Sequence, residues 1–500
     1  MAKGVVGVDW NFDNSFTRLP ELLFVRQDPL PVTSPILVML NESLASELGL
    51  DVDQLKSVGA EIFSGNIIPS GAEPIAQAYA GHQFGYFTML GDGRAIVLGE
   101  LLGLDGRRFD LQLKGSGRTP FSRNGDGRAA LGPMLREYVV SEAMYFLGIP
   151  TTRSLAVVSS GEQVYRESPL SGALLARIAA SHIRVGTFEY AARLADKAVV
   201  KELADYAIAR HYPEVFESED SYRGFLASVI KRQASLVARW MGVGFIHGVM
   251  NTDNMAISGE TIDYGPCAFL DEYHSGKVFS SIDRHGRYAF TNQAHIAQWN
   301  LARFAETLLS LLAPDLDQAI AIARAEVGSF ADIFKQEWLL VMRRKLGLFN
   351  EEKEDESLIE ELLSLMQQHG ADYTNTFRKL GAEPGRLEHI LENTQGNIPG
   401  SVVVDGGFHS WQARWQARLL RQAQSAAEVS ALMKANNPFV IPRNHRLERA
   451  LDAATDFGDF LPVQKLLGVL KRPYEDNLEH LDYCQPPTAD ERVQATFCGT

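Results

Sequence analysis

The segment from Phe245 to Gly265 constrains the fold of this 500-residue chain more than any other feature. It follows an apolar helical pattern, contains a loop with Asp253 and Asn254, and ends in the tripeptide Asp263-Tyr-Gly. Its pattern predicts a short β-hairpin with arms at 255–258 and 261–263. Asn254 and Asp263 would then lie at opposite ends of one hairpin, where their oxygens suit Mg²⁺, which takes oxygen ligands from few protein groups. The sequence therefore predicts a compact divalent-metal site.

The order of these parts is the order found in kinase-like enzymes: a catalytic loop, a metal-binding Asn, a hairpin and a metal-binding Asp. A second pair of residues fits the same scheme. Lys114 ends an apolar strand predicted over 109–114, and Glu137 lies in a helix predicted over 131–147. A lysine buried on a strand needs an anion, because an unpaired buried ammonium group is costly. We therefore expect Glu137 to pair with Lys114 and to position it for nucleotide phosphates, as in the protein-kinase fold.

One position departs from the kinase pattern. Kinases carry an Asp two residues after the His of the catalytic loop, and here Val249 stands two residues after His247. The usual proton acceptor is therefore absent, although Asp253 offers a carboxylate beside Asn254. This departure leaves two interpretations: the protein is catalytically inactive, or it handles ATP differently from a kinase. His247 itself is best explained as a structural histidine that braces the loop.

A glycine-rich segment and a local excess of positive charge indicate a phosphate ligand. Gly91, Gly93 and Arg94 precede a strand predicted over 95–98, and glycines allow the backbone to approach a phosphate closely. Residues 94–136 contain eight cations and four anions, although the whole chain has a formal net charge of −14. This local excess of positive charge suits a small polyanion such as a nucleoside triphosphate. The simpler alternatives are that the glycines form an ordinary β-turn and that the charged residues form a solvated face.

Composition argues against several other classes of protein. The chain has 48 Lys and Arg against 62 Asp and Glu, so it has no general attraction to nucleic acid or to anionic membranes. No apolar run reaches the roughly 18 residues that suggest a membrane span, and the first residues do not resemble a secretory signal. Three cysteines are too few for a disulfide framework. We expect a cytoplasmic protein whose partners include neither nucleic acid nor membrane.

The periodicity of the sequence changes near residue 185, which predicts an α+β fold. Short strands dominate before that point, including a hairpin expected at 156–158 and 163–165. Helices are expected afterwards over 188–210, 222–240, 296–312, 316–346 and 351–368. We predict a bilobal protein-kinase-like fold with a β-rich N-lobe, a mostly helical C-lobe and a C-terminal helical extension. The expected units are residues 1–185, 186–345 and 346–480, with a mobile tail at 481–500.

Three runs of sequence together resemble the selenoprotein O family. They are Tyr79-Ala-Gly-His-Gln-Phe-Gly85, Leu111-Gln-Leu-Lys-Gly-Ser-Gly-Arg-Thr-Pro-Phe-Ser-Arg123, and His247-Gly-Val-Met-Asn-Thr-Asp-Asn-Met255 with Asp263-Tyr-Gly-Pro-Cys-Ala-Phe269. The resemblance extends over nearly the whole chain. It implies a fold similar to that of protein kinases and a protein adenylyltransferase activity. In that activity ATP binds in an inverted orientation, AMP is transferred to Ser, Thr or Tyr hydroxyls of other proteins, and pyrophosphate is released.

The resemblance also implies roles for individual residues. Those on the ATP would be Gly91, Gly93, Arg94, Lys114, Asp126, Gly127 and Asp263, with Arg177 and Arg184 on the buried terminal phosphates. Glu137 would support Lys114. Asp253 would act as the base, and Asn254 and Asp263 would be the ligands of the Mg²⁺ or Mn²⁺ cofactor.

Two cysteines suggest a redox element. Cys267 lies four residues after Asp263, in the segment expected to cover the site, and Cys498 lies in the predicted tail. We hypothesise that oxidation joins the two cysteines and restrains that segment; two unrelated thiols are the alternative. Eukaryotic members of the family carry selenocysteine near the C-terminus, where this chain has Cys498.

Three functions compete on the sequence. The first is metal-dependent AMP transfer from ATP to protein hydroxyls, with UTP as an alternative donor. The second is γ-phosphoryl transfer, against which Val249 argues. The third is a nucleotide-binding scaffold without activity, against which the presence of Lys114, Asn254 and Asp263 argues.

Overall fold

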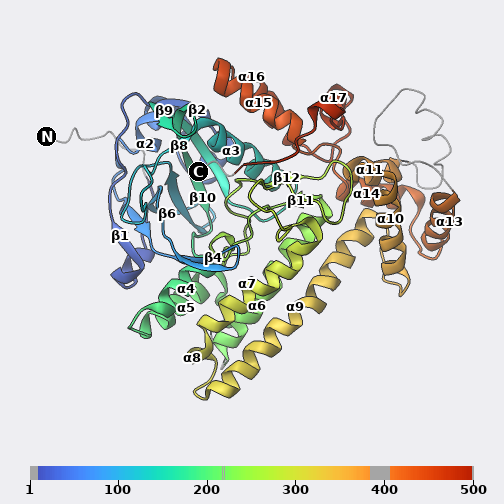
Figure 1. The fold of residues 1–500 in the computed structure, drawn as a ribbon, viewed down its shortest axis with the longest axis horizontal. Helices are drawn as coiled ribbons and strands as arrows, with labels where there is room; N and C mark the ends of the chain where they lie inside the picture. The colour runs from blue at the N-terminus through green and yellow to red at the C-terminus, as the bar shows by residue number, and fades with distance from the viewer. Residues whose placement is uncertain (1–9, 217, 219, 383–405, 498–500) are drawn as a thin grey trace.

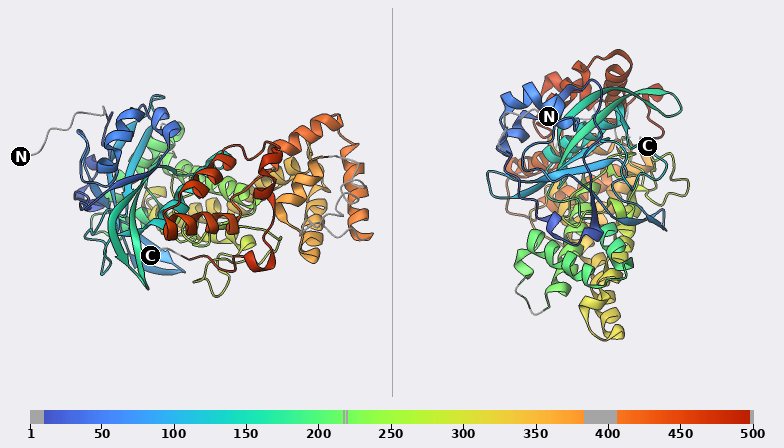
Figure 2. Two further views of the ribbon diagram at one scale, coloured as in Figure 1. Left: turned by 90° about the horizontal axis from the view of Figure 1, so that it is seen from above. Right: turned by 90° about the vertical axis from the view of Figure 1, so that its left-hand side faces the viewer.

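The protein combines a β-rich layer with a larger helical part, which confirms the expectation of an α+β chain (Figure 1). The structure is a computed structural model and describes residues 10–216, 218, 220–382 and 406–497. Figure 2 shows the β-rich part at one end of an elongated molecule and the helices of residues 355–382 and 406–436 toward the other end. Among the described residues, no helix combines the length and the apolar character needed to cross a membrane.

An antiparallel sheet of eight strands forms the first part. Its main path runs in the order β1 (Phe24–Arg26), β3 (Ile75–Gln77), β6 (Ala95–Leu102), β7 (Arg108–Lys114), β10 (Pro169–Ala179), β9 (Arg153–Tyr165) and β2 (Ile36–Leu40), and β8 (Ala129–Ala130) pairs with β10. The strands expected at 95–98 and 109–114 are thus confirmed as parts of β6 and β7. They lie side by side, with Ala95 opposite Lys114.

The two faces of this sheet have different roles. Its covering helices are α1 (Glu42–Glu47) and α2 (Val52–Phe63) on one face and α3 (Leu131–Phe146) on the other. Along β7, Leu111 and Leu113 belong to the core under α2. Successive side chains of a strand point to opposite faces, so Gln112 and Lys114 lie on the α3 face. Arg177 of β10 stands opposite Gln112, which places it on that face as well.

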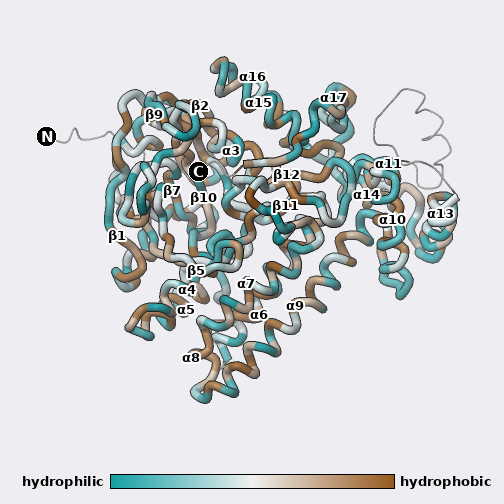
Figure 3. The backbone as a smooth tube through the Cα atoms, in the orientation of Figure 1, coloured by the Kyte–Doolittle hydropathy of each residue, from teal (hydrophilic) through white to brown (hydrophobic). Residues whose placement is uncertain are grey.

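The helical part begins after the sheet. Its helices are α4 (Val185–Arg193), α5 (Ala198–His211), α6 (Ser221–Gly242), α7 (Gln293–Thr307), α8 (Leu309–Leu312), α9 (Leu316–Lys345), α10 (Asp355–His369), α11 (Tyr373–Ala382), α13 (Gly406–Leu419), α14 (Ala426–Asn436), α15 (Asn444–Phe457), α16 (Leu461–Leu470) and α17 (Leu481–Cys484). Helices α6, α7 and α9 pack along one another. In Figure 3 they alternate between hydrophobic and hydrophilic colours, as helices with one buried face do.

Two helices expected as continuous are each divided. The segment expected over 188–210 forms α4 and α5, and the one expected over 296–312 forms α7 and α8. At the first break the Asp196 side chain accepts a hydrogen bond from the backbone N of Ala198 at 2.9 Å. Such a local bond competes with continuation of the helix and favours a new start.

Two predicted hairpins are wrong. Residues 156–158 and 163–165 belong to the single strand β9, because Gly161, with φ +72°, bends the strand without reversing it. The predicted arms at 255–258 and 261–263 do not pair with each other either. Ala256 bridges Arg184, and Thr261 bridges Thr151. Each predicted arm therefore pairs with a segment that is distant in sequence but adjacent in space. These tertiary pairings replace the hydrogen bonds that the two arms would make with each other in a hairpin.

The C-terminal helices return to the β-rich part and pack on α3 (Figure 1). The described end of the chain differs from the mobile tail expected at 481–500. An isolated β-bridge joins Thr496 to Ser280, and the backbone N of Thr496 donates a hydrogen bond to Phe279 O at 2.7 Å. The side chain of Thr496, 3% exposed, donates to Pro266 O at 2.5 Å. The chain up to Phe497 is therefore bound along the segment that follows Asp263. The division into four units stays a prediction.

One buried lysine gives the fold a pH dependence. Lys345 at the end of α9 is 1% exposed, and its Nζ lies 4.3 Å from the ring centroid of Phe377 and 5.4 Å from that of Tyr373. No carboxylate pairs with it among the described residues. Burial lowers the pKa of Lys345 to about 7. An unfolded lysine has a pKa of about 10.4, so the unfolded state binds more protons between these two values, and the free energy of unfolding rises with pH across that window.

We expect Lys345→Met to flatten this rise. The wild-type melting temperature should increase from pH 7 to pH 9 relative to that of the variant, because wild type then no longer carries a buried charge. Differential scanning calorimetry at both pH values measures the effect. Lys465→Met on α16, at an exposed position, is the control and should keep the wild-type slope. Equal slopes for Lys345→Met and wild type would contradict the assignment.

Candidate active site

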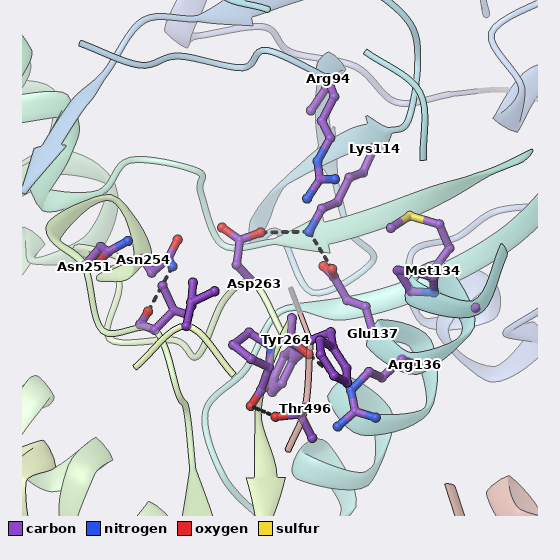
Figure 4. Close-up of a pocket in the computed structure, with 18 of the residues that line it drawn as sticks. Arg94, Lys114, Met134, Arg136, Glu137, Asn251, Asn254, Asp263, Tyr264 and Thr496 are labelled. Carbon is purple, nitrogen blue, oxygen red and sulfur yellow. Dashed lines mark hydrogen bonds and ion pairs between the residues drawn. The ribbon is translucent and has the colours of Figure 1, made fainter. Parts of the chain in front are cut away.

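Most of the residues predicted from the sequence to form the site converge on one cavity of about 760 Å³, which Figure 4 shows in close-up. The wall formed by the sheet and α3 includes Tyr79, Asp92, Gly93, Arg94, Lys114, Glu137, Arg177 and Arg184. The opposite wall, formed by the loop after β11 (Phe245–Ile246) and the segment before β12 (Ala268–Phe269), includes Val249, Asp253, Asn254 and Asp263. Figure 4 shows Lys114 and Asp263 pointing toward each other from these two walls.

An ion-pair network joins the two walls. The Nζ of Lys114 lies 2.5 Å from an oxygen of Glu137 and 3.0 Å from Oδ1 of Asp263. Lys114 comes from the end of β7 and Glu137 from the second turn of α3, so the expected strand–helix pair is present. All three side chains are mostly buried, with Lys114 9% and Asp263 21% exposed. Buried charges of this kind persist because each has an opposite partner.

Two arginines complete a cluster of cations around Asp263. Arg177 lies 2.6 Å from Oδ1 of Asp263 and 3.1 Å from Glu137, and Arg184 lies 3.3 Å from Oδ2 of Asp263. Burial raises the pKa of Asp263, but the charges of Lys114, Arg177 and Arg184 outweigh it and hold that pKa well below its ordinary value. Asp263 is therefore ionised and lies at the centre of the cluster.

The backbone at Asp263 is strained. Its φ of +64° lies in the left-handed region, which costs a non-glycine residue roughly 1–2 kcal/mol. Ion pairs with three cations compensate this cost, and the conformation directs the carboxylate toward the sheet. Strain of this kind is found where function fixes a side chain in one position.

Asp253 and Asn254 lie on a short 3-10 turn (Thr252–Asn254) across the cavity from the sheet. Oδ1 of Asp253 is buried without a hydrogen-bond partner, and Oδ2 is 3.5 Å from the amide of Gln83. Burial raises the pKa of Asp253 to about 6. The amide nitrogen of Asn254 donates to Val249 O at 2.9 Å, and Figure 4 shows its amide oxygen on the opposite side, toward Asp263. Both residues therefore present oxygens to the cavity.

The run Tyr79–Gly85, which contributed only to the family resemblance, supports this turn. It forms the first strand and the turn of a hairpin of β4 (Ala80–Gln83) and β5 (Tyr86–Met89). The backbone N of His82 donates to Thr252 Oγ1 at 2.6 Å, and that of Phe84 donates to Asn251 Oδ1 at 3.1 Å. The hairpin therefore holds the loop that carries Asp253 and Asn254 through its backbone, a role that the sequence did not indicate.

Gly81 in this hairpin sets the position of Asp253, which leads to a prediction. A Cβ atom at Gly81 would overlap Oδ1 of Asp253, so Gly81→Ala should displace that carboxylate. We expect kcat/KM for the AMP transfer that the family resemblance implies to fall by at least about tenfold, a typical cost of misplacing a group that acts on the substrate. Gly328→Ala, in helix α9 with no atom near its added methyl group, is the control. Gly328→Ala should melt near the wild-type temperature, whereas the overlap should lower the melting temperature of Gly81→Ala without abolishing its cooperative unfolding. An unchanged kcat/KM for Gly81→Ala would contradict the expected role of Asp253.

The glycine-rich segment lies at the edge of the cavity. Gly93 and Arg94 line it as expected, and so does Asp92 between the two glycines, which the sequence did not single out. The Asp92 carboxylate accepts from the backbone N of Gln77 at 3.1 Å, and burial raises its pKa to about 6. Gly91 is outside the lining and has φ +130°, which lets the turn pack against a phenylalanine ring.

Two further predicted nucleotide contacts are not brought to this cavity. Asp126 is exposed and pairs with Arg166 at 2.8 Å, and Gly127 packs against the backbone of Gly117. His247 is buried, and its Nε2 lies 2.9 Å from Ile262 O, in keeping with a structural role. Cys498, one partner of the hypothesised redox pair, lies outside the described residues.

Cys267 is a buried free thiol in the segment after Asp263. Burial raises its pKa to about 11, which disfavours the reactive thiolate. Arg136 of α3 donates to Cys267 O at 2.6 Å and to Gly265 O at 3.1 Å. Arg136 thus fixes the segment after Asp263 to α3, and it also pairs with Glu448 of α15.

Sequence reasoning missed a third wall of the cavity. It comes from α15 and the end of the described chain and consists of Glu448, Leu451, Asp452, Thr455, Val493, Ala495, Thr496 and Phe497. These positions follow Phe245–Gly265 by almost 200 residues or more, and no motif connects the two parts of the sequence. Only the return of the C-terminal helices to α3 brings them together.

Comparisons with known proteins agree with this geometry. A family model described as protein adenylyltransferase SelO matches residues 8–471. Similar relatives, each described as protein nucleotidyltransferase YdiU, include one from Brevibacillus brevis, 56% identical over 501 residues, which covers 100% of this chain and 99% of the relative. Another, from Syntrophotalea carbinolica, is 55% identical over 496 residues, covering 99% of this chain and 98% of the relative. The resemblance found in the sequence is thus confirmed: the chain belongs to the SelO family of protein adenylyltransferases and is a nucleotidyltransferase enzyme.

Proposed function

We propose that this protein transfers AMP from ATP to Ser, Thr or Tyr hydroxyls of other proteins, within a bilobal kinase-like fold and with ATP inverted relative to kinases. The observation that carries the proposal is the cluster in which Lys114, Arg177 and Arg184 all contact Asp263. The family and the names of its relatives support nucleotidyl transfer to protein.

The charges of this cluster suit a polyphosphate leaving group. Three fixed cations face two carboxylates, those of Asp263 and Glu137, which leaves one net positive charge. In the kinase fold one strand lysine with its glutamate positions the phosphates, and here two buried arginines are added. Transfer of AMP makes pyrophosphate the leaving group, and preorganised cations stabilise the charge that develops on it. An inverted ATP would place its β- and γ-phosphates at this cluster and its α-phosphate toward the loop with Asp253.

Asn254 and Asp263 fit a divalent metal. One carboxylate and one amide oxygen are hard donors, and Mg²⁺ or Mn²⁺ bound with a nucleotide uses one or two protein groups and takes its remaining ligands from phosphates and water. The hydrogen bond from the Asn254 amide nitrogen to Val249 O leaves its oxygen available. When bound, the metal would supply charge neutralisation and orientation of the phosphates.

The proposed transfer balances as a single displacement. The hydroxyl oxygen of the protein substrate forms a bond to the α-phosphorus of ATP, and the bond from that phosphorus to the α,β-bridging oxygen breaks. Pyrophosphate leaves with the bonding electron pair. The hydroxyl proton passes to the carboxylate of Asp253, which lines the cavity. With a pKa of about 6, Asp253 is ionised at neutral pH and is a better base than an ordinary aspartate.

The second candidate, γ-phosphoryl transfer, is disfavoured by Val249. This apolar residue lines the cavity at the position where kinases place their aspartate. A scaffold without activity is disfavoured because the buried charges of Lys114, Arg177 and Asp263 are maintained in contact across the two walls.

Incubation with ATP labelled at either the α- or the γ-phosphate tests the proposal. With MgCl₂ or MnCl₂ and a mixture of soluble proteins, we expect label on protein from α-labelled ATP alone, together with release of labelled pyrophosphate from γ-labelled ATP. Label from the γ-position alone would establish a kinase. Absence of both kinds of label under these conditions would favour the scaffold.

A further inference from the structure

A groove adjoins the catalytic cavity on the side of the β4–β5 hairpin. It has a volume of about 610 Å³ and lies between that hairpin, the segment 282–287 and the first turns of α7. Phe84 and Ile282 line both this groove and the catalytic cavity. A polypeptide lying in the groove would therefore run directly into the cavity. We call it the hairpin groove.

Exposed apolar side chains line the hairpin groove. Tyr86 is 80% exposed and Ile282 is 51% exposed, and Trp299 of α7 lies part-exposed beside them. Large apolar side chains gathered at the surface beside a binding cavity mark interaction sites. Aromatic side chains in particular serve as contact surfaces for a protein partner.

The groove also carries basic side chains without matching anions. Arg284, His285 and His295 are exposed, and none forms an ion pair with another residue of the described chain; of the three, Arg284 carries a permanent positive charge. The guanidinium carbon of Arg287 lies 4.8 Å from the ring centroid of Trp299. The Nε of Arg287 is buried without a hydrogen-bond partner. The segment 282–287 therefore brings the positive charges of Arg284 and Arg287 to the groove, and α7 adds the imidazole of His295.

The anions near this surface are already engaged. Asp283 is buried and accepts hydrogen bonds from the backbone N of Arg287 at 2.9 Å and of Tyr288 at 2.8 Å. Glu306 pairs with Arg303 at 2.6 Å, and Glu189 contacts His82 and Thr252 behind the hairpin. The charges presented in the groove itself are thus mostly positive, on a chain whose formal net charge is −14.

We propose that the hairpin groove binds an acidic segment of the protein substrate, with an apolar side chain of that segment on Tyr86 and Ile282. This inference rests on the proposed function and adds a substrate class: proteins whose acceptor hydroxyl is flanked by Asp or Glu. The net negative charge of the enzyme repels anions at long range. Screening limits that repulsion to roughly 8–10 Å at physiological salt, so the cations of the groove decide binding at contact.

Two matched peptides test the proposal by binding. Both carry fluorescein, a central serine and a phenylalanine on each side; the remaining positions are Glu in one peptide and Lys in the other. Fluorescence anisotropy should show the Glu peptide bound about tenfold or more tighter, since several exposed charge pairs contribute up to about 1 kcal/mol each. Affinity should fall as NaCl rises. The double variant Arg284→Glu with His295→Glu should lose this preference or reverse it.

Arg324→Glu is the matched control. Arg324 is exposed on α9, outside the groove, and its reversal changes the net charge as one groove substitution does. This control should bind the Glu peptide like wild type, and melting temperatures should agree among all three proteins. Equal binding of the two peptides by wild type, or an equal loss of affinity in Arg324→Glu, would overturn the proposal.

Transfer of label from α-labelled ATP to the same peptides separates this inference from the proposed function. Selective binding of the Glu peptide without AMP transfer would support the groove as the binding site of an acidic segment and would contradict the proposed function. Transfer to both peptides at equal kcat/KM would support the proposed function and would overturn the preference for acidic segments. We expect the groove double variant to raise KM for the Glu peptide and to leave kcat nearly unchanged.

Discussion

Asp263→Asn should lower kcat/KM for AMP transfer by at least about a thousandfold, because several kcal/mol of electrostatic stabilisation depend on this carboxylate. Asparagine has nearly the same shape but no charge, so it is a poor ligand for Mg²⁺ or Mn²⁺. Its amide group would also present a donor to Lys114, Arg177 or Arg184, each of which now contacts an oxygen of Asp263. The measurement is transfer from α-labelled ATP under single-turnover conditions.

Loss of activity in this variant must be separated from loss of the fold. Removing one partner of a buried ion pair can cost about 3–5 kcal/mol, so a lower melting temperature is expected without ligand. The same change makes the cluster more positive, because the cations keep only Glu137 as their anion. Metal-free ATP should therefore bind Asp263→Asn at least as tightly as wild type, which calorimetry measures and an unfolded protein would not show.

Asp452→Asn is the matched control for this experiment. Asp452 also lines the cavity but lies on α15 and is exposed. The isosteric change there should leave kcat/KM within about twofold of wild type, as for surface substitutions that affect no network. If Asp263→Asn transferred AMP at a rate similar to this control, Asp263 would not be the metal ligand and the proposed site would be wrong.

The sequence was most informative where chemistry demands a fixed residue type. A lysine at the inward end of an apolar strand needs an anion, and Glu137 supplies it at 2.5 Å from Lys114. The strands expected at 95–98 and 109–114 likewise lie within β6 and β7. These inferences hold because strand periodicity and the cost of an unpaired buried charge act locally or through a single partner.

Long-range pairing explains what the sequence did not predict. Residues 255–263 have the pattern of a hairpin, yet Ala256 and Thr261 bridge Arg184 and Thr151, which the local pattern cannot specify. The wall contributed by α15 and Thr496 has no motif either. The assignment of Asp126 and Gly127 to the nucleotide, which the family resemblance implies, stays a prediction, and neither residue lines the cavity.

Asp253→Asn is the second substitution with a large expected effect, a loss of about 10²–10⁴-fold in kcat, the range that a general base contributes. Asparagine cannot accept the hydroxyl proton. The fold should persist, because Oδ1 of Asp253 has no hydrogen-bond partner to lose and Oδ2 has one long contact with Gln83. Removal of a buried, unpaired carboxylate should even raise the melting temperature, since burial disfavours its charge.

Binding distinguishes a lost base from a lost site. Arg184 contacts the backbone oxygen of Asp253 at 2.9 Å, and the substitution leaves that bond intact, so ATP affinity should match wild type while kcat falls. Asp452→Asn again serves as the control in the same cavity. If Asp253→Asn kept kcat within about fivefold of wild type, another group would have to accept the hydroxyl proton, since removal of a general base costs far more. Because Val249 offers no carboxylate, Asp92 on the opposite wall, whose pKa burial raises to about 6, would then be the next candidate to test.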